Sequence, residues 1–202
     1  MNKHRTSRSG SGIIRIISGL HKGRKLPVLD MPGLRPTTDR VKETLFNWLM
    51  FRIQDKKVLD AFSGAGSLGF EAQSRGASEV VMLELNPKVS AQLKNNAGVL
   101  NCTNVTVKQT DTLKFLHDCH ESFDIIFLDP PFRTGLLEEA VKLLNDTVAP
   151  PGCLVYIEHE RENEPELPEK FNLLKSGHAG QVTYSLYEIT AKADTDSAAD
   201  NG

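Results

Sequence analysis

Three glycines and a glutamate in the first half of the chain have the spacing of a nucleotide-binding loop. In the stretch VLDAFSGAGSLGFEA, Gly64, Gly66 and Gly69 follow the pattern GxGxxG. The first two glycines allow a tight turn whose backbone can approach a ligand, and Gly69 allows close packing of the helix that follows. Glu84 lies 20 residues after Gly64, where a carboxylate can bind two ribose hydroxyls. The spacing alone suits NAD and S-adenosylmethionine (SAM) equally, because both contain adenosine.

Two further features separate these ligands. Asp60 stands four residues before Gly64. A carboxylate there would repel a pyrophosphate, but it can accept hydrogen bonds from the ammonium group of a methionine, directly or through water. The stretch DPPF, residues 129–132, has no use in a dehydrogenase. Both features favour SAM, and an NAD-dependent oxidoreductase remains an alternative.

The DPPF stretch is the most specific signal in the chain. It resembles the [D/N]-P-P-[F/Y/W] motif of SAM-dependent methyltransferases that act on exocyclic amines of bases or on glutamine amides. The amino nitrogen of a base is a poor nucleophile because its lone pair is delocalised into the ring. Asp129 and the Pro130 carbonyl oxygen can each accept one N–H bond, which holds the nitrogen toward tetrahedral geometry and aims its lone pair at the methyl carbon. Phe132 offers a face on which the base can stack.

We therefore expect three catalytic residues, Asp129, Pro130 and Phe132, and no metal. The sulfonium group of SAM is itself a good leaving group, and the amine loses its proton late, so neither a Lewis acid nor a strong base is required. The same motif leaves open an adenine-N6 DNA methyltransferase or a protein-glutamine methyltransferase.

These residues need a scaffold, and the chain from Lys57 onward predicts one. Apolar runs typical of strands, such as KVLDAF and EVVMLEL, alternate with helical patterns. FNLLKSG and QVTYSLYEI then predict an antiparallel closing pair. The alternation predicts an α/β fold with a doubly wound, mostly parallel sheet, in which ligands bind beyond the carboxyl ends of the strands.

Four of the predicted strands end in an acidic residue: Asp60, Glu84, Asp111 and Asp129. Four acids on one sheet edge indicate a binding site, although Asp111 taken alone could equally be the N-cap of a short helix. We expect the cofactor to contact residues around the first three strand ends, namely Asp60, Phe62, Ser63, Gly64, Gly66, Glu84, Leu85, Asp111 and Thr112.

The N-terminal part predicts a small addition to this sheet. IIRIISG and RKLPV flank LHKG and indicate a β-hairpin with basic residues at its turn. A helix follows Pro36, capped by Thr37 or Thr38. The predicted organisation is a basic disordered tail at 1–11, a hairpin and helix extension at 12–56, the α/β domain at 57–190, and a disordered tail at 191–202.

Charge is distributed unevenly along the chain. Residues 1–57 hold 13 Lys+Arg and 4 Asp+Glu, a net +9, so the remainder, with 11 against 22, carries −11 and the whole chain −2. A basic region on an acidic body favours a polyanionic partner, although each basic residue taken singly could be a solvated surface charge. The candidate residues for binding such a polyanion are Arg24, Lys25, Arg35, Arg40 and Arg133.

Other function classes have weak support. No apolar run approaches the roughly 18 residues of a membrane span, and the N-terminus lacks the apolar core of a secretory signal. The 3 cysteines form no short motif, which fits a reducing cytoplasm. His117 and His120 lie at the end of a predicted short helix, and we expect an exposed helix end there rather than a metal site. His159 lies in EHEREN, a charged run that we expect to be solvated.

Taken together, the motifs resemble those of the RsmD family, bacterial methyltransferases of 16S ribosomal RNA that modify guanine 966 at N2. The resemblance rests on GSGIIRIISGLHKGRKLPV, GLRPTTDRVKETLFNWL, LDAFSGAGSLGFEA, LDPPFRTGLLEE and AGQVTYSLY, and it covers roughly residues 10–190. RPTTDRVKETLFNWL is its family-specific part. The glycine loop and DPPF are shared with many amine methyltransferases.

The resemblance implies a class I methyltransferase (Rossmann-like) sheet of seven strands with an N-terminal hairpin, SAM as the methyl donor, and a cytoplasmic protein. Its partner would be 16S rRNA or the small ribosomal subunit, and we expect a monomer. A guanine in structured RNA must leave its stack to reach Asp129. A non-catalytic RNA-binding or assembly factor with the same fold is a further alternative, against which the complete set of Asp60, Glu84 and Asp129 argues.

Overall fold

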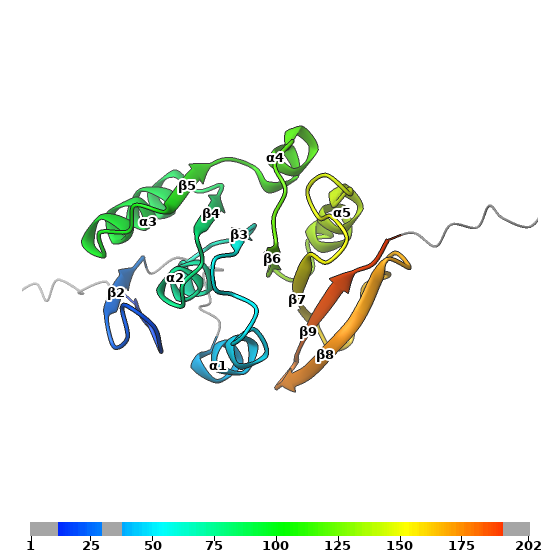
Figure 1. The fold of residues 1–202 in the computed structure, drawn as a ribbon, viewed down its shortest axis with the longest axis horizontal. Coiled ribbons are helices and arrows are strands. Elements are labelled where there is room, and N and C mark those ends of the chain that lie inside the picture. The colour runs from blue at the N-terminus through cyan, green and yellow to red at the C-terminus, as the bar shows by residue number, and fades with distance from the viewer. Residues whose placement is uncertain (1–11, 30–37, 192–202) are drawn as a thin grey trace, which may run out of the picture.

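A seven-stranded sheet forms the centre of the protein. The computed structural model describes residues 12–29 and 38–191. The strands have the order β5-β4-β3-β6-β7-β9-β8 (Figure 1). Five neighbouring strands are parallel. They are β3 (Lys57–Asp60), β4 (Glu79–Glu84), β5 (Val105–Gln109), β6 (Ile125–Leu128) and β7 (Leu154–Glu160).

An antiparallel pair closes the other edge of the sheet. β8 (Phe171–Ala179) and β9 (Val182–Ile189) pair with each other, and β9 also pairs antiparallel with β7. β7 is therefore an interior strand with a neighbour on each side. The mostly parallel, doubly wound sheet with an antiparallel closing pair is confirmed.

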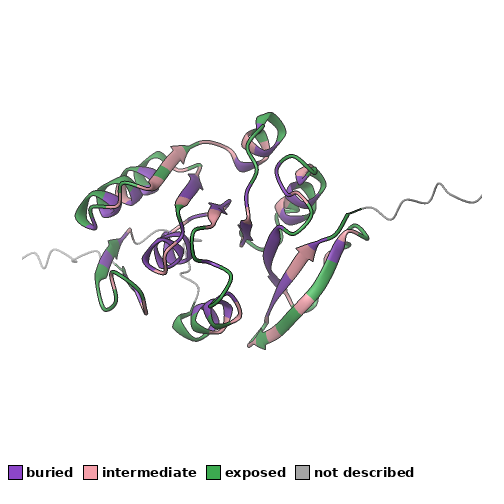
Figure 2. Ribbon diagram, in the orientation of Figure 1, coloured by how far each residue is buried: buried purple, intermediate pink, exposed green. Residues whose placement is uncertain are grey.

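Helices cover both faces of the sheet (Figure 1). They are α1 (Asp39–Trp48), α2 (Ser67–Ser74), α3 (Pro87–Val99), α4 (Thr112–Asp118) and α5 (Leu136–Leu143). Successive strand residues face opposite sides. Val58 joins a core with α1, α2 and α3, whereas Leu59 joins a second core with α4 and α5. Burial on both faces explains why the central strands are almost wholly apolar (Figure 2).

Side-chain caps fix the starts of three helices, two of them at Thr38 and Asp111, which the sequence offers as caps. Thr38 Oγ1 accepts a hydrogen bond from Val41 N at the start of α1. Asn86 caps α3, with Pro87 as the first helical residue. Asp111 Oδ1 accepts a hydrogen bond from Lys114 N at 2.9 Å, so Asp111 is the N-cap of α4. Each cap satisfies a backbone N–H that has no partner inside the helix.

The N-terminal hairpin is present and packs on the sheet domain. β1 (Gly12–Arg15) pairs antiparallel with β2 (Lys25–Val28). Ile14 and Leu26 are buried in the core that contains α1, α2 and α3. The hairpin and the α/β part thus share one core, and the division at residue 56 stays a prediction. The predicted tails, apart from Ala191, and Arg35 lie outside the described residues.

No helix within residues 12–29 and 38–191 is long and apolar enough to cross a membrane.

Candidate functional site

Three of the predicted acids meet at the carboxyl edge of the parallel strands. Asp60 ends β3, Glu84 ends β4 and Asp129 follows β6, and β3 lies between the other two strands. Val58 and Met82 face the core under α1, α2 and α3, so Asp60 and Glu84, each two residues further along, face the same side. Asp60 is close enough to Glu84 and Asp129 for both charges to raise its pKa. The edge therefore holds a cluster of carboxylates.

The glycine loop wraps around Asp60. Gly64 and Gly66 have φ values of 47° and 81°, in the left-handed region that favours glycine. Gly69 N donates a hydrogen bond to Asp60 Oδ2 at 2.9 Å. A Cβ at Gly69 would stand 2.9 Å from the same oxygen and 3.0 Å from Met82. Gly69 thus allows the close packing of α2 on β4 that the sequence predicts, and it also leaves room for the Asp60 carboxylate.

The Asp60 carboxyl is buried, and its pKa is raised to about 7. Burial is the largest cause, because it penalises the charged form, and the negative charges of Asp129 and Glu84 add to it. The hydrogen bond from Gly69 N opposes the rise. Asp60 is therefore close to half ionised at neutral pH, and a cationic ligand would favour the ionised form.

Glu84 is held by backbone donors at the end of β4. Gly64 N donates to Oε2 at 3.1 Å and Asn86 N donates to Oε1 at 2.7 Å. Burial raises the pKa of the carboxyl, and these hydrogen bonds oppose the rise. Each oxygen has a further lone pair, so the fixed carboxylate can still accept hydrogen bonds from two hydroxyl groups.

The remaining predicted cofactor residues divide into those that hold the loop and those that face solvent. Ser63 Oγ donates to the Asp60 carbonyl oxygen at 2.9 Å, and Thr112 Oγ1 donates to the Ala61 carbonyl oxygen. Phe62 is partly buried against the core that contains α4 and α5. Leu85, by contrast, is exposed, and Asp111 is half-buried.

The DPPF loop follows β6 beside this cluster. Asp129 is half-buried, Pro130 is buried and Phe132 is exposed. Arg133 has a φ of 61°, a left-handed conformation that is uncommon outside glycine. Its Nε donates to both carboxylate oxygens of Glu160, at 3.0 and 3.2 Å. The ion pair ties the loop to the end of β7 and fixes where the guanidinium points.

Three site features were missed by the sequence reasoning. Ser67 Oγ is buried directly after Gly66 and has no hydrogen-bond partner within the described part of the chain. Glu160 holds Arg133, as described above. Glu158 and His159 are buried in β7, so the prediction that EHEREN is a solvated run is wrong for its first two residues. The strand-like pattern of CLVYIEH was the available signal, since it placed both residues inside a strand.

The candidate RNA-binding residues that the structure describes do not all come together. Arg133 lies at the carboxyl edge, and Arg40 is exposed in the first turn of α1. Arg24 Nη2 instead donates to the carbonyl oxygen of Val99, the last residue of α3. Since α3 leaves the carboxyl end of β4 and returns to the amino end of β5, Arg24 lies toward the amino edge. Lys25, opposite Arg15 in the hairpin, is its neighbour in sequence.

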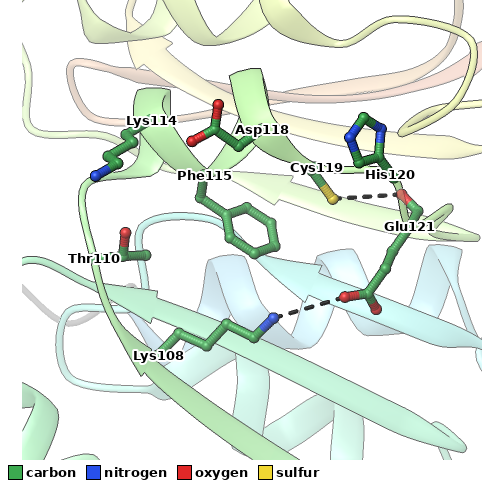
Figure 3. Close-up of a pocket in the computed structure, with 8 residues that line it drawn as sticks. All are labelled: Lys108, Thr110, Lys114, Phe115, Asp118, Cys119, His120 and Glu121. Atoms are coloured by element: carbon green, nitrogen blue, oxygen red, sulfur yellow. Dashed lines mark hydrogen bonds and ion pairs between the residues drawn. The ribbon is translucent and has the colours of Figure 1, made fainter.

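A pocket of about 380 Å³ lies between β5 and α4 (Figure 3). Lys108 pairs there with Glu121 at 3.7 Å and lies over the ring of Phe115. His120 and Cys119 also line it, and His117 and His120 are exposed, as expected for a helix end. Within the described residues, no group of three or more His, Cys, Asp or Glu side chains could hold a metal ion. The pocket contains none of the predicted site residues.

Comparisons with known proteins agree on one family. Residues 14–188 match the family model described as Conserved hypothetical protein 95. The chain is 48% identical over 190 residues to Ribosomal RNA small subunit methyltransferase D of Escherichia coli strain K12, covering 93% of this chain and 96% of that protein. It is also 48% identical to the protein of that name from Haemophilus influenzae, covering 89% and 96%.

Solved structures give the same result. The Escherichia coli protein yhhF superposes with a TM-score of 0.83 at 44% identity, covering 90% of this chain and 100% of that one. The Haemophilus influenzae protein HI0767 superposes with a TM-score of 0.78, also at 44% identity, covering 89% and 100%. With the class I methyltransferase fold and the strand-edge site described above, these matches show that the chain belongs to the RsmD family.

Proposed function

We propose that this protein transfers a methyl group from SAM to the exocyclic N2 amine of a guanine in 16S ribosomal RNA, at position 966 by family resemblance. The observation that carries the proposal is the position of the DPPF loop, next to the carboxylates of Asp60 and Glu84 on one sheet edge. The name of the relatives, ribosomal RNA small subunit methyltransferase D, supports the substrate class.

The residues at the strand edge fit SAM. The buried Asp60 carboxylate, which has no cation partner within the described residues, matches an ammonium group. Glu84 has lone pairs for two ribose hydroxyls, and the orphan hydroxyl of Ser67 is a further polar partner beside the glycine turn. Exposed Leu85 and half-buried Asp111 are available to the adenine. When bound, SAM supplies an electrophilic methyl carbon on a sulfonium sulfur that leaves with the bonding electron pair.

The chain's own residues then orient the acceptor amine. Asp129 and the Pro130 carbonyl oxygen each accept an N–H bond, which localises the nitrogen lone pair and directs it at the methyl carbon. As the new N–C bond forms, the nitrogen becomes strongly acidic and its proton passes to Asp129 and on to water. Phe132, exposed beside these acceptors, stacks on the base.

Basic residues hold the RNA at two separate places. Arg133 is exposed and adjoins the DPPF loop, so it can contact a phosphate near the flipped guanine, and Arg40 is an exposed cation in the first turn of α1 that can contact another phosphate. Arg24 and Lys25 sit toward the opposite edge and would contact a more distant part of the RNA. Residues 30–37, which include Arg35, lie outside the described structure.

Nucleoside mass spectrometry tests the proposal. Small-subunit RNA from a strain lacking this gene is incubated with SAM and either wild-type protein or Asp129→Ala. We expect N2-methylguanosine with wild type and at least a hundredfold less with Asp129→Ala, because the amine loses its charged acceptor. Calorimetry should show that the variant still binds SAM.

Asp118→Ala is the matched control, since Asp118 is an exposed carboxylate at the end of α4. It should leave the yield of N2-methylguanosine unchanged. Full activity of Asp129→Ala would refute the mechanism. If wild-type protein binds SAM but methylates only DNA adenine or a glutamine-containing protein, the substrate assignment is wrong.

A further inference from the structure

A buried glutamate that the proposed mechanism does not use ends the strand next to the DPPF loop. The candidate cofactor residues Asp60 and Glu84 end β3 and β4, Asp129 follows β6, and β6 lies between β3 and β7. In the proposed complex the target amine stands between the cofactor and the rest of its base. The base therefore extends away from β3 and over β7, whose carboxyl end holds Glu158.

Glu158 and Asp129 are neighbours at this edge of the sheet. Each comes directly after the last paired position of its strand in the parallel register of β6 and β7. Phe127 and Tyr156, two residues earlier in each strand, face the core under α1, α2 and α3, so Asp129 and Glu158 face that side as well. Neighbouring strands lie roughly 5 Å apart. One base can therefore meet both side chains.

Glu158 can offer one carboxyl oxygen to a ligand. Tyr156 is fully buried, and its hydroxyl donates to Glu158 Oε1 at 2.7 Å. Oε2 has no hydrogen-bond partner within the described residues, although the exposed fraction of Glu158 is only 6%. Burial, and then the charge of Asp129, raise the pKa of the carboxyl to about 8. A ligand that brings an N–H donor to such an oxygen stabilises the ionised form.

The Watson–Crick edge of guanine carries a donor in the required place. The amine at C2 and the N1–H group are adjacent on this edge, and both donate hydrogen bonds. When the amine lies against Asp129 and the Pro130 carbonyl oxygen, N1–H is the next donor along. Adenine has an unprotonated N1, which is an acceptor. An acceptor beside Asp129 would therefore read the identity of the base through its Watson–Crick edge.

We propose that Glu158 is a specificity-determining residue, whose Oε2 accepts the N1–H bond of the target guanine while Asp129 accepts a bond from the amine. This role rests on the proposed function. Tyr156 takes part by holding Oε1, which leaves Oε2 for the base. A base with an unprotonated N1 places a lone pair against the carboxylate and is rejected.

The first test compares three RNAs with wild-type protein. Small-subunit RNA is assembled around a synthetic segment with guanine, 6-thioguanine or 2-aminopurine at the target position. All three bases carry the amine at C2, but 2-aminopurine lacks N1–H. We expect kcat/KM for 6-thioguanine to lie within about tenfold of that for guanine, and kcat/KM for 2-aminopurine to be about a hundredfold lower or less.

Two outcomes would refute the inference, and neither requires a variant that folds. Comparable kcat/KM values for 2-aminopurine and guanine would show that N1–H is not read. Equal losses with 6-thioguanine and 2-aminopurine would assign the discrimination to O6.

Glu158→Gln tests the residue itself. The amide keeps the shape of the side chain and an acceptor for the Tyr156 hydroxyl, and its NH₂ group can donate to an unprotonated N1. We expect the ratio of kcat/KM for guanine over 2-aminopurine to fall by about tenfold or more. This ratio, compared with that of wild type, cancels the different reactivities of the two amines. An unchanged ratio, in a variant that binds SAM, would show that Glu158 does not read the base.

Glu162→Gln is the matched control, because Glu162 is an exposed glutamate in the loop after β7. It should keep the wild-type ratio.

A binding measurement separates the inference from the proposed function. Fluorescence anisotropy gives the affinity of labelled guanine and 2-aminopurine RNAs for the protein with S-adenosylhomocysteine, so no methyl transfer occurs. We expect wild type to prefer guanine and Glu158→Gln to lose much of that preference. Wild-type protein that shows this pattern but makes no N2-methylguanosine would overturn only the proposed function. Formation of N2-methylguanosine with no such preference, in binding or in rate, would overturn only the inference.

Discussion

At the scale of single residues, the candidate site contains a carboxyl group whose burial makes ionisation unfavourable in the free protein. Asp60 is buried at the end of β3 with its pKa raised to about 7, and its hydrogen-bond donor is Gly69 N. Such a carboxyl group is poorly solvated in the free protein, and its ionised form is stabilised when a cation binds beside it. A carboxylate in this state is expected of a ligand-binding residue rather than of a purely structural one.

The affinity for SAM should therefore depend on pH. In the proposed complex the ammonium group of SAM binds the ionised Asp60 carboxylate, so the affinity should fall as pH drops below about 7, approaching tenfold per pH unit. Calorimetry in buffers of different ionisation enthalpy should detect proton release on binding at pH 6. An affinity that stays constant from pH 5 to 8 would show that Asp60 does not meet the ammonium.

The same carboxyl should lower the stability of the free protein. Its folded pKa of about 7 lies above the ordinary value of 3.8, so the folded state holds more protons between these pH values. The contribution of Asp60 to the free energy of unfolding therefore decreases as pH rises from about 4 to 7, and it stays at the lower value above pH 7. Asp60→Asn should raise the melting temperature at pH 8 by several degrees and change it little at pH 4. A lower melting temperature at pH 8 would contradict this.

At the scale of elements, a buried ionic cluster joins the hairpin to the helices. Glu71 on α2 is fully buried and accepts hydrogen bonds from Ile17 N at 2.8 Å and Ser18 N at 3.0 Å. Arg75 Nε donates to it at 2.7 Å. Lys42 on α1 donates to the Arg15 carbonyl oxygen at 2.6 Å. Because α2 begins at the glycine loop, the hairpin and the candidate cofactor site share one helix.

Removing Glu71 should release the hairpin. Glu71→Ala leaves two backbone N–H groups buried without their acceptor and removes the carboxylate that stands 4.0 Å from the buried Lys42 ammonium. We therefore expect a loss of about 3–5 kcal/mol in the free energy of unfolding. Hydrogen exchange should then become faster in residues 12–28. Arg52→Ala, which breaks the exposed Arg52–Glu188 pair, is the control and should cost about 1 kcal/mol or less. Equal effects of the two substitutions would refute the role given to Glu71.

At the scale of the whole molecule, two of the described candidate RNA-binding residues lie toward opposite edges of the sheet. Arg133 extends from the DPPF loop at the carboxyl edge, whereas Arg24 reaches the end of α3 toward the amino edge. An RNA that touches both residues must therefore extend across the protein. A short RNA that carries only the target loop would reach Arg133 alone.

Two substrates distinguish these contacts. Arg133→Ala should raise KM several-fold on both small-subunit RNA and a short stem-loop. It should also reduce the slope of log KM against log salt concentration by about the amount that one phosphate contact contributes. Arg24→Ala should raise KM only on the long RNA. An equal effect of Arg24→Ala on the stem-loop would place the RNA on a different path.

Much of this protein follows from its sequence alone. The alternation of apolar strands with amphipathic helices predicted the doubly wound sheet, because period and polarity are properties of consecutive residues. Thr38 and Asp111 cap helices as the sequence suggested, since a capping side chain bonds a backbone N–H only a few residues away. The carboxyl ends of parallel strands meet at one edge, so the cluster around Asp60 and Asp129 was also predictable.

Other features were decided only by the tertiary structure. Glu158 and His159 look like part of a charged run, but β6 and β9 flank their strand and bury them. From the sequence, Arg24 is a candidate RNA-binding residue like Arg133. In the structure it hydrogen-bonds to Val99 at the end of α3, which lies toward the opposite edge of the sheet. Whether a charged side chain is solvated, and which other groups it meets, depends on segments distant in the chain. Local sequence cannot specify those neighbours, because burial and charge coupling arise only when the strands and helices pack together.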